Sequence, residues 1–373
     1  MTETTRRSLV VVGAGVFGAS LARHCARAGW TVTLVERVAP GHVRSGSGDE
    51  SRLIRCAHGD DAWHTRSARR ALDLWREIDP ALVAEAGVIW FARREDGWEA
   101  DSERVLRSLG IACERVDAAT LFPSVATGDL AFALLEHEAG VLRARDATRA
   151  LAAQAVEAGA DLVLEEARPA GAAVALAGGR RLEADYVVWA CGAWLPALFP
   201  GILDLRITQQ DVFFFGAGAA WCTPGVPGWV DYDGAAYGLG DLDGRGVKVS
   251  PDVEGPDIDA ETAPRVPLAE HERLARAYLA HRFPALADAP LVGTRTCQYE
   301  LTADTNFVVA PHPEHDGRVW LLGGGSGHGF KHGPALAEHV EAWLTAAEPP
   351  DPRFALGSRR ADRGLRTAGA TSA

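Results

Sequence analysis

A glycine-rich segment near the start of the chain has the spacing of a phosphate-binding turn. The segment Gly13-Ala14-Gly15-Val16-Phe17-Gly18 follows the apolar run Leu9–Val12 and opens a helical pattern. Glycines at these positions permit a tight turn, backbone approach to a pyrophosphate and close packing of helix on strand. The helix N-terminus would then face the phosphates. The alternative, glycines that serve chain packing alone, stays open.

A carboxylate closes the second strand of the same unit. Glu36 stands 18 residues after the last glycine, where it can accept hydrogen bonds from ribose hydroxyls, and Arg37 follows it. The carboxylate would repel a ribose 2′-phosphate, so NADP is disfavoured and NAD or FAD remains. A later buried strand, Tyr186–Trp189, is followed by Gly192 and Trp194. Such a strand end lets a flavin nucleotide lie against the backbone, although packing explains it equally well.

Two segments near the C-terminus carry further chemistry. Cys297 lies in Arg295-Thr-Cys-Gln-Tyr299, and Gly323-Gly-Gly-Ser-Gly-His-Gly-Phe-Lys331 leads into a helical pattern. A thiolate is a strong nucleophile, whereas a lone cysteine is usually a small buried hydrophobe. Loop N–H groups before a helix can stabilise negative charge on a bound ring, but such a stretch can also be a mobile loop.

Together with Ser51-Arg52-Leu-Ile-Arg55 and Gly246-Val-Lys248, these segments resemble the monomeric sarcosine oxidase and N-methyltryptophan oxidase family. These are FAD-dependent amine oxidases of the D-amino-acid-oxidase-like superfamily, and the resemblance covers nearly the whole chain. It implies an α/β (α+β overall) fold, in which a glutathione-reductase-like FAD-binding Rossmann domain carries an inserted, mostly antiparallel β-sheet substrate domain. It also implies covalent FAD, attached as an 8α-S-cysteinyl thioether at Cys297.

The motifs and the resemblance together predict one set of cofactor contacts. They are Gly13, Gly15, Val16, Phe17, Gly18, Glu36, Arg37, Ser51, Arg52, Gly192, Trp194, Cys297, Gly325, Gly327, Gly329 and Lys331.

Three cations are implied to act in catalysis. Arg55 and Lys331 match the family's carboxylate-binding pair, in which an arginine fork and a lysine point charge orient the substrate amine. Lys248 and Lys331 are the two lysines of the chain. Lys248 matches the lysine that assists the reaction of reduced flavin with oxygen, because a fixed cation stabilises superoxide-like charge. Isolated cations are otherwise usually solvated surface groups.

The other implied site residues are aromatic. Tyr237 and Tyr299 match tyrosines that line the family's substrate cavity, with ordinary core aromatics as the alternative. His328 matches a loop histidine that contacts the flavin.

Two cavity positions depart from the sarcosine oxidase pattern. His58 stands where a tyrosine is found and Asp252 where a histidine is found, and Trp63 lies in the variable segment after Arg55. A gained carboxylate favours a substrate with an extra positive or donor group, or a ring. We therefore expect a cyclic secondary amino acid or a biosynthetic intermediate rather than sarcosine.

The expected reaction is oxidation of a small carboxylate-bearing secondary amine, cyclic or N-methylated, to an imine, with O2 reduced to H2O2. Lone-pair donation by the neutral amine assists C–H cleavage, so an alkaline pH optimum is expected. The alternatives are a flavin-dependent amino-acid dehydrogenase, a biosynthetic tailoring oxidase acting on a cyclic imine or amine, and a non-catalytic dinucleotide-binding sensor.

Composition narrows the class of protein. The 38 basic and 50 acidic residues give a formal net charge of −12, without a basic run, which argues against nucleic-acid or anionic-membrane partners. Six scattered cysteines favour the cytoplasm and argue against a metal site. No apolar run approaches the ~18 residues of a membrane span. We expect a monomer.

The 373 residues exceed what one core usually holds, so two domains are expected. Residues 1–83, 140–205 and 302–350 are assigned to a discontinuous FAD-binding domain. Residues 84–139 and 206–301 are assigned to the substrate domain, and 351–373 to a flexible tail.

Overall fold

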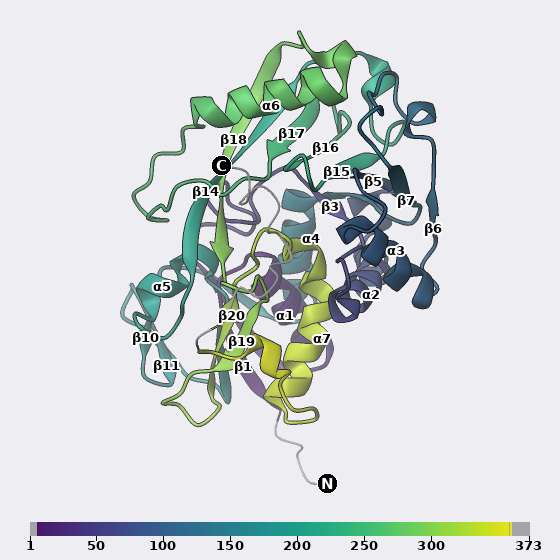
Figure 1. Ribbon diagram of the computed structural model, residues 1–373. Helices are drawn as coiled ribbons and strands as arrows, with labels where there is room; N and C mark the ends of the chain where they lie inside the picture. Colours follow the sequence, from purple (N-terminus) through teal and green to yellow (C-terminus); the bar gives the residue numbers. More distant parts are fainter. Residues whose placement is uncertain (1–5, 358, 360–373) are drawn as a thin grey trace.

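A computed structural model describes residues 6–357 and 359 (Figure 1). Two large sheets organise the chain, one of six strands and one of eight. The strands of the six-stranded sheet come from residues 8–36, 161–189 and 308–323, and those of the eight-stranded sheet from 88–136 and 206–301. The mixed α/β fold with a discontinuous Rossmann domain and an inserted, mostly antiparallel sheet is confirmed. The exact domain boundaries stay a prediction.

The six-stranded sheet has the strand order β19-β20-β13-β1-β2-β9. Its strands are β1 (Ser8–Val12), β2 (Thr31–Glu36), β9 (Asp161–Leu164), β13 (Tyr186–Trp189), β19 (Val308–Pro311) and β20 (Val319–Gly323). All neighbouring pairs are parallel except β19 with β20. Parallel sheets are covered on both faces, which explains the continuous apolar run of β1.

Alternate residues of β1 face opposite layers. Leu9 and Val11 belong to the core formed with α1 (Val16–Arg27), α2 (Ala62–Ile78), α4 (Ala144–Glu157) and α7 (Gly333–Leu344). Val10 and Val12 pack on the other side, against α5 (Leu195–Leu198) and a three-stranded sheet of β10 (Ala167–Ala170), β11 (Ala173–Leu176) and β12 (Arg181–Leu182). This is the period of two expected for a strand.

The eight-stranded sheet has the order β18-β14-β17-β16-β15-β5-β7-β6. Its strands are β5 (Val88–Ala92), β6 (Cys113–Arg115), β7 (Phe132–Glu136), β14 (Arg206–Phe215), β15 (Gly228–Asp231), β16 (Ala236–Leu239), β17 (Val247–Pro251) and β18 (Leu291–Leu301). One face packs against α6 (Ala269–Arg282), as Figure 1 shows, and the other packs toward α2 and α3 (Trp98–Ser108).

A small sheet connects these layers, and short helices join the strands. The small sheet consists of β3 (Ser51–Ile54), β4 (Val83–Ala84) and β8 (Gly140–Arg143). The 3-10 helices are Pro80–Leu82, Ala118–Thr120, Gly192–Trp194, Ala219–Trp221, Pro284–Leu286, Phe330–His332 and Pro352–Phe354.

The start of the expected C-terminal tail is packed on the molecule. Phe354 is fully buried in the core beside α7, and Arg353 pairs with Asp61. Residue 358 and residues 360–373 lie outside the described residues.

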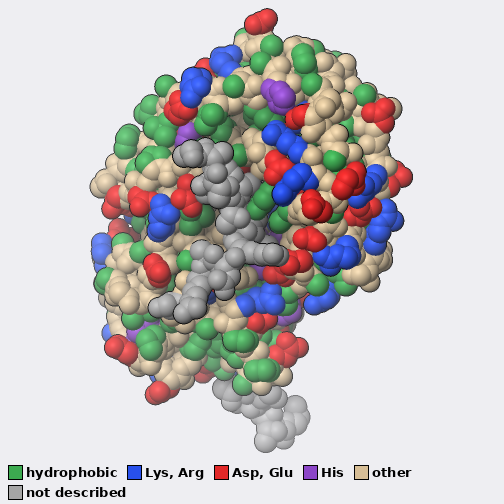
Figure 2. Space-filling view, in the orientation of Figure 1, with side chains coloured by type: hydrophobic (Ala, Val, Ile, Leu, Met, Phe, Trp, Pro, Cys, Tyr) green, Lys and Arg blue, Asp and Glu red, His purple; other side chains and the backbone are tan. Residues whose placement is uncertain are grey.

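Charged side chains of both signs intermix on the face shown in Figure 2, without a continuous basic band there. Among residues 6–357, no helix combines the length and apolarity needed to cross a bilayer.

Arg282, the last residue of α6, ties this helix to the sheet. It is fully buried, and its guanidinium bonds to Asp129 at 2.8 and 3.0 Å and to the buried Asp231 of β15 at 3.0 Å. We expect Arg282→Met to lower the free energy of unfolding by about 3 kcal/mol, because Asp231 loses a buried partner. Arg273→Ala, on the same helix but in an exposed pair with Glu270, should change it by less than ~1 kcal/mol. Urea unfolding measures both, and equal effects would contradict this reading.

Candidate active site

A cavity of about 450 Å³ opens at the carboxyl end of β1. Gly13, Gly15, Val16 and Phe17 line it. A Cβ on Gly13 would overlap the Ala190 carbonyl, and Gly13 has a φ of +101°. Gly15 instead faces the cavity. A Cβ added to Gly15 would have Ser47 Oγ as its nearest neighbour, at 3.4 Å. The glycines therefore serve both packing and backbone access, at different positions.

Gly18 lies behind this cavity and does not line it. A Cβ on Gly18 would overlap the carbonyl oxygen of Gly13, so this glycine permits α1 to approach the turn closely. The N–H of Val16 at the start of α1 donates to Ser47 Oγ at 3.0 Å.

Glu36 organises the far end of the cavity. Its carboxylate accepts hydrogen bonds from the Ala14 N–H at 2.9 Å and the Val38 N–H at 3.0 Å. Arg37 lies over the Trp194 ring, 5.3 Å from its centroid, and both side chains bond to Glu261. Apart from Ala14, all of these residues line the cavity, as does Gly192.

β18 carries Cys297 to the same cavity. Cys297 pairs with Gln210 of β14, and Arg52 Nη2 lies 3.7 Å from Cys297 Sγ. Tyr299, two residues along the same face, also lines this large cavity. It does not line the smaller cavity described below, where the expectation placed it.

The glycine-rich loop after β20 closes the opposite wall. Gly325, Gly327 and Gly329 line the cavity, and Ser326 is buried against the Glu300 and Gly324 carbonyl oxygens. Glu300 Oε2 accepts from the Gly324 N–H at 3.3 Å. Burial raises the pKa of Glu300 to about 7, against these backbone hydrogen bonds.

A second, smaller cavity of about 60 Å³ adjoins the first. Arg52, Gly327 and Phe330 line both cavities, so the two meet at these residues. Four of the expected catalytic residues line this cavity. Three aromatic residues that the sequence had not indicated, and Asp252, which it had, line it as well. The lining includes Arg55, Lys331, Tyr237 and His328, together with Trp90, Trp98, Tyr232 and Asp252.

The expected carboxylate-binding pair is brought together at this smaller cavity. The Arg55 guanidinium lies 4.7 Å from the centroid of the Trp90 ring and donates to the Ala57 carbonyl. Lys331 Nζ donates to the His328 carbonyl at 2.9 Å and is buried. Beside them, Glu136 accepts from Trp90 Nε1 at 2.8 Å, and burial raises its pKa.

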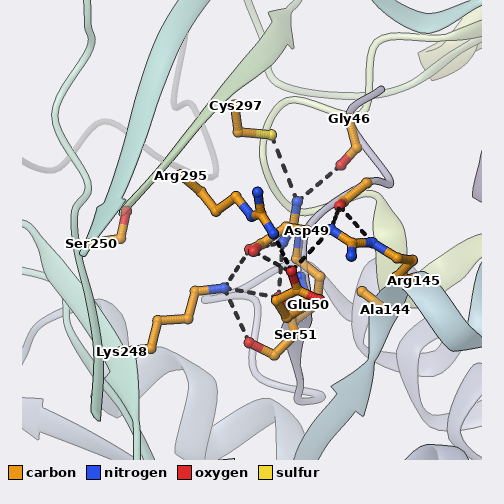
Figure 3. A network of polar contacts seen from close by, with 12 residues as sticks. Gly46, Asp49, Glu50, Ser51, Ala144, Arg145, Lys248, Ser250, Arg295 and Cys297 are labelled. Carbon is orange, nitrogen blue, oxygen red and sulfur yellow. Dashed lines mark hydrogen bonds and ion pairs between the residues drawn. The ribbon is translucent and has the colours of Figure 1, made fainter. Parts of the chain in front are cut away.

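Lys248 lies elsewhere, in a buried ion network (Figure 3). Its Nζ donates to Asp49 Oδ2 at 2.6 Å, to the Ser51 carbonyl at 2.9 Å and to Ser51 Oγ at 3.2 Å. Arg52 also bonds to Asp49. Burial would raise the pKa of Asp49, but Lys248 and Arg52 hold it well below its usual range.

This network changes two expectations. Lys248 is fully buried and lines neither cavity, and Ser51 binds Lys248 rather than facing the cofactor cavity. The sequence contained no signal for Asp49 as their partner, because the acidic pair Asp49-Glu50 before a strand has no distinctive pattern.

Three histidines lie close together at the small cavity, and His328 is the one of them that lines it. Burial, and then the neighbouring Lys331, hold the pKa values of His58, His328 and His332 well below the ordinary value. His328 is therefore a neutral imidazole at pH 7. Of these residues, sequence reasoning considered His58 and His328 but not His332.

Comparison with known proteins identifies the family. A model of the family described as FAD dependent oxidoreductase matches residues 8–343. The chain belongs to this family.

Relatives support the same assignment. This FAD-dependent oxidoreductase is 27% identical to the monomeric sarcosine oxidase of Streptomyces avermitilis over 359 residues, 89% of this chain and 92% of that protein. It is 26% identical to the N-methyl-L-tryptophan oxidase of Salmonella dublin over 349 residues, 88% and 92% of the two chains. The resemblance found in the sequence motifs is confirmed.

Solved structures share the fold. L-proline dehydrogenase from P. horikoshii superposes with a TM-score of 0.82 at 20% identity, covering 93% of this chain and 96% of that chain. Fructosamine oxidase (Amadoriase II) from Aspergillus fumigatus gives a TM-score of 0.79 at 21% identity, covering 94% and 88%.

The larger cavity fits FAD. Gly15 leaves its backbone open to a pyrophosphate, and Glu36 stands at the end of β2, where a ribose is bound. At the opposite end, Arg52, Cys297 and the glycine-rich loop would surround the flavin ring.

Glu300 provides a pH test of this site. Its folded-state pKa of about 7 lies above the value near 4.3 of an unfolded glutamate, so the folded state binds more protons between these values. The protonated Glu300 side chain therefore contributes its full share to the free energy of unfolding below about pH 4. This contribution is lost as the pH rises toward 7. We expect FAD-free Glu300→Gln to gain stability over wild type at pH 8 but not at pH 4.5, measured by urea unfolding. Glu183→Gln, at an exposed carboxylate, should show no such pH-dependent difference.

Proposed function

We propose that the protein oxidises a small carboxylate-bearing secondary amine to an imine and reduces O2 to H2O2. The amine loses two electrons and two protons, and O2 gains both. The observation that carries this proposal is the junction of the two cavities at Arg52, Gly327 and Phe330. It sets a small aromatic-walled chamber with two cations directly beside the space that fits FAD.

Arg55 and Lys331 are the residues that would hold the substrate carboxylate. Both line the small cavity, and their charges come from separate elements, the segment that follows β3 and the 3-10 helix Phe330–His332. Arginine presents a planar fork to a carboxylate and lysine a point charge, which together fix the orientation of the amine. The aromatic walls exclude water from the reacting carbon.

The amine reacts in its neutral form. Bound FAD supplies the two-electron oxidising power for cleavage of the C–H bond. Lone-pair donation by the neutral amine assists C–H cleavage, so no strong base is required from the chain. Burial and the neighbouring Lys331 lower the pKa of His328, which makes its imidazole a weak base. The rate should rise with pH as the bound amine loses its proton.

We further propose that FAD is attached through Cys297. Cys297 Sγ lines the larger cavity next to Arg52, at the end where the flavin ring would lie. The other five cysteines do not share this position, since Cys191 lines the cavity near Gly192, and the rest lie outside its lining.

The walls of the small cavity support a substrate with a ring. The Trp98 and Tyr232 rings stack at 5.0 Å with an angle of 11° between their planes, and Asp252 adds a carboxylate to the same lining. We propose a cyclic secondary amino acid, or a cyclic biosynthetic intermediate, as the substrate class. Rapid turnover of sarcosine by the pure protein would contradict this.

The first test is the attachment of the flavin. After acid precipitation we expect the yellow colour to remain in the wild-type pellet and to leave the pellet of Cys297→Ala. Cys222→Ala, at an exposed cysteine, serves as the matched control and should retain the colour. Release of the colour from wild type would contradict the thioether, while the binding of FAD would still be supported.

The second test is recognition of the carboxylate. We expect Arg55→Met to lower kcat/KM for a cyclic secondary amino acid by about 100-fold, equivalent to roughly 3 kcal/mol for a lost charged hydrogen bond. The decarboxylated ring amine should be turned over equally, and poorly, by both proteins. An equal loss for both substrates would show that Arg55 acts on the fold rather than on the carboxylate. Steady-state rates with proline and pyrrolidine make the comparison.

A dehydrogenase is the second candidate, because Lys248 is paired with Asp49 and lines neither cavity. Its charge is then less available to assist reduction of oxygen. Stopped-flow mixing of the substrate-reduced protein with air decides between them. Fast return of the oxidised spectrum supports the oxidase, whereas slow return that a quinone accelerates supports the dehydrogenase.

A further inference from the structure

His58, His328 and His332 form a compact buried cluster behind the substrate cavity. His58 follows β3, whereas His328 and His332 lie in and just after the glycine-rich loop. Their ring centroids are 5.2 to 5.9 Å apart, and they are only 1%, 6% and 0% exposed. One ring nitrogen from each lies within 4.8 Å of the others.

Each ring is fixed by a hydrogen bond at its outer nitrogen. His58 Nδ1 lies 2.8 Å from the Cys56 carbonyl, and His328 Nε2 lies 2.9 Å from the Thr305 carbonyl. Because a carbonyl only accepts, these two nitrogens carry the protons, and the inner nitrogens carry lone pairs. His332 Nδ1 lies 2.9 Å from Ser67 Oγ.

The inner nitrogens have no protein partner. Within the described part of the chain, nothing forms a hydrogen bond with His58 Nε2, His328 Nδ1 or His332 Nε2. A buried polar atom left unpaired costs about 1–3 kcal/mol, and three such nitrogens meet at one place. The cluster therefore requires an occupant that accepts electron pairs or donates hydrogen bonds.

We propose that His58, His328 and His332 bind a divalent transition-metal ion of the Zn²⁺ type. Imidazole nitrogen is a preferred ligand of zinc, copper and nickel, and three histidines with an open fourth position form a known kind of zinc site. Metal-binding histidines commonly donate their outer N–H to a backbone carbonyl, as His58 and His328 do. The absence of a carboxylate or other oxygen ligand among the three argues against Ca²⁺ and Mg²⁺.

Binding requires only a small contraction. Ligand nitrogens about 2.1 Å from a tetrahedral ion lie about 3.4 Å apart, so the rings must move inward from their present separation of up to 4.8 Å. His64 lies next to the cluster, its ring centroid 5.2 Å from that of His328. His64 is not part of the group whose ring nitrogens lie within 4.8 Å of one another, so the fourth coordination position would be open to water.

The charged side chains around the three histidines limit the affinity of this cluster for a metal cation. Arg55 and Lys331 oppose a cation, while Asp61 lies 3.0 Å from Nδ1 of the neighbouring His64. Lys331 bonds to the backbone of His328, so an ion that fixes His328 also positions Lys331. A bound substrate carboxylate would offset the added positive charge.

The test uses the FAD-loaded protein without an affinity tag. After treatment with a chelator and addition of Zn²⁺, we expect about one ion per chain by elemental analysis and a Tm higher by about 3 °C. With Co²⁺ we expect absorption bands beyond the flavin spectrum that report a low-coordinate nitrogen site.

Matched variants locate the ion. His332→Phe and His58→Phe should lose the metal, and His332→Cys, which supplies another zinc ligand, should retain it. His281→Ala, at an exposed histidine on α6, should bind like wild type. The proposal is overturned if chelated wild type takes up no stoichiometric ion, which would indicate bound water instead. It is also overturned if His332→Phe and His58→Phe fold and bind metal as wild type does.

Discussion

The pairing of Asp49 with Lys248 and Arg52 is the constraint on which the site depends. Asp49 precedes β3 and Lys248 belongs to β17, so the pair joins the small sheet to the eight-stranded sheet. A fully buried ammonium is tolerated only with an anion in contact. The same carboxylate holds Arg52, the residue that lines both cavities. One buried acid thus fixes both the join between the sheets and the place where cofactor and substrate spaces meet.

Charge balance explains why the smaller cavity suits an anion. Arg55 and Lys331 line it, and the neighbouring Glu136 has a raised pKa because it is buried. Its four hydrogen-bond contacts come from backbone N–H groups and Trp90, and it also interacts electrostatically with Arg55. A substrate carboxylate would add a further anion beside the two cations. Asp252 lies in the same lining and would favour a positive or donor group at another point of the substrate.

The sequence predicted those features that short patterns encode. The glycine segment, the position of Glu36, the buried strands and the loop after β20 are each set by neighbours within a few residues. The role of Lys248 was expected from its match to a family position, but the partner that determines its environment, Asp49, is 199 residues away. Tyr299 was placed in the wrong cavity for a similar reason, since the pattern gives the strand but not which side of Arg52 the side chain reaches. Trp90 and Trp98 lie outside the short motifs, so the sequence does not single them out as cavity residues.

The histidine cluster is a second case in which residues far apart in the sequence form one site that no short pattern predicts. The expectation of no metal site rested on the spacing of cysteines along the chain, which is informative only when ligands are close in sequence. His58 and His328 come from segments that meet because β3 contacts the 3-10 helix at Phe330–His332. His58 is also one of the two positions that depart from the sarcosine oxidase pattern. The sequence associated this position with substrate recognition, but His58 does not line the small cavity. It is buried against His328 and His332 instead.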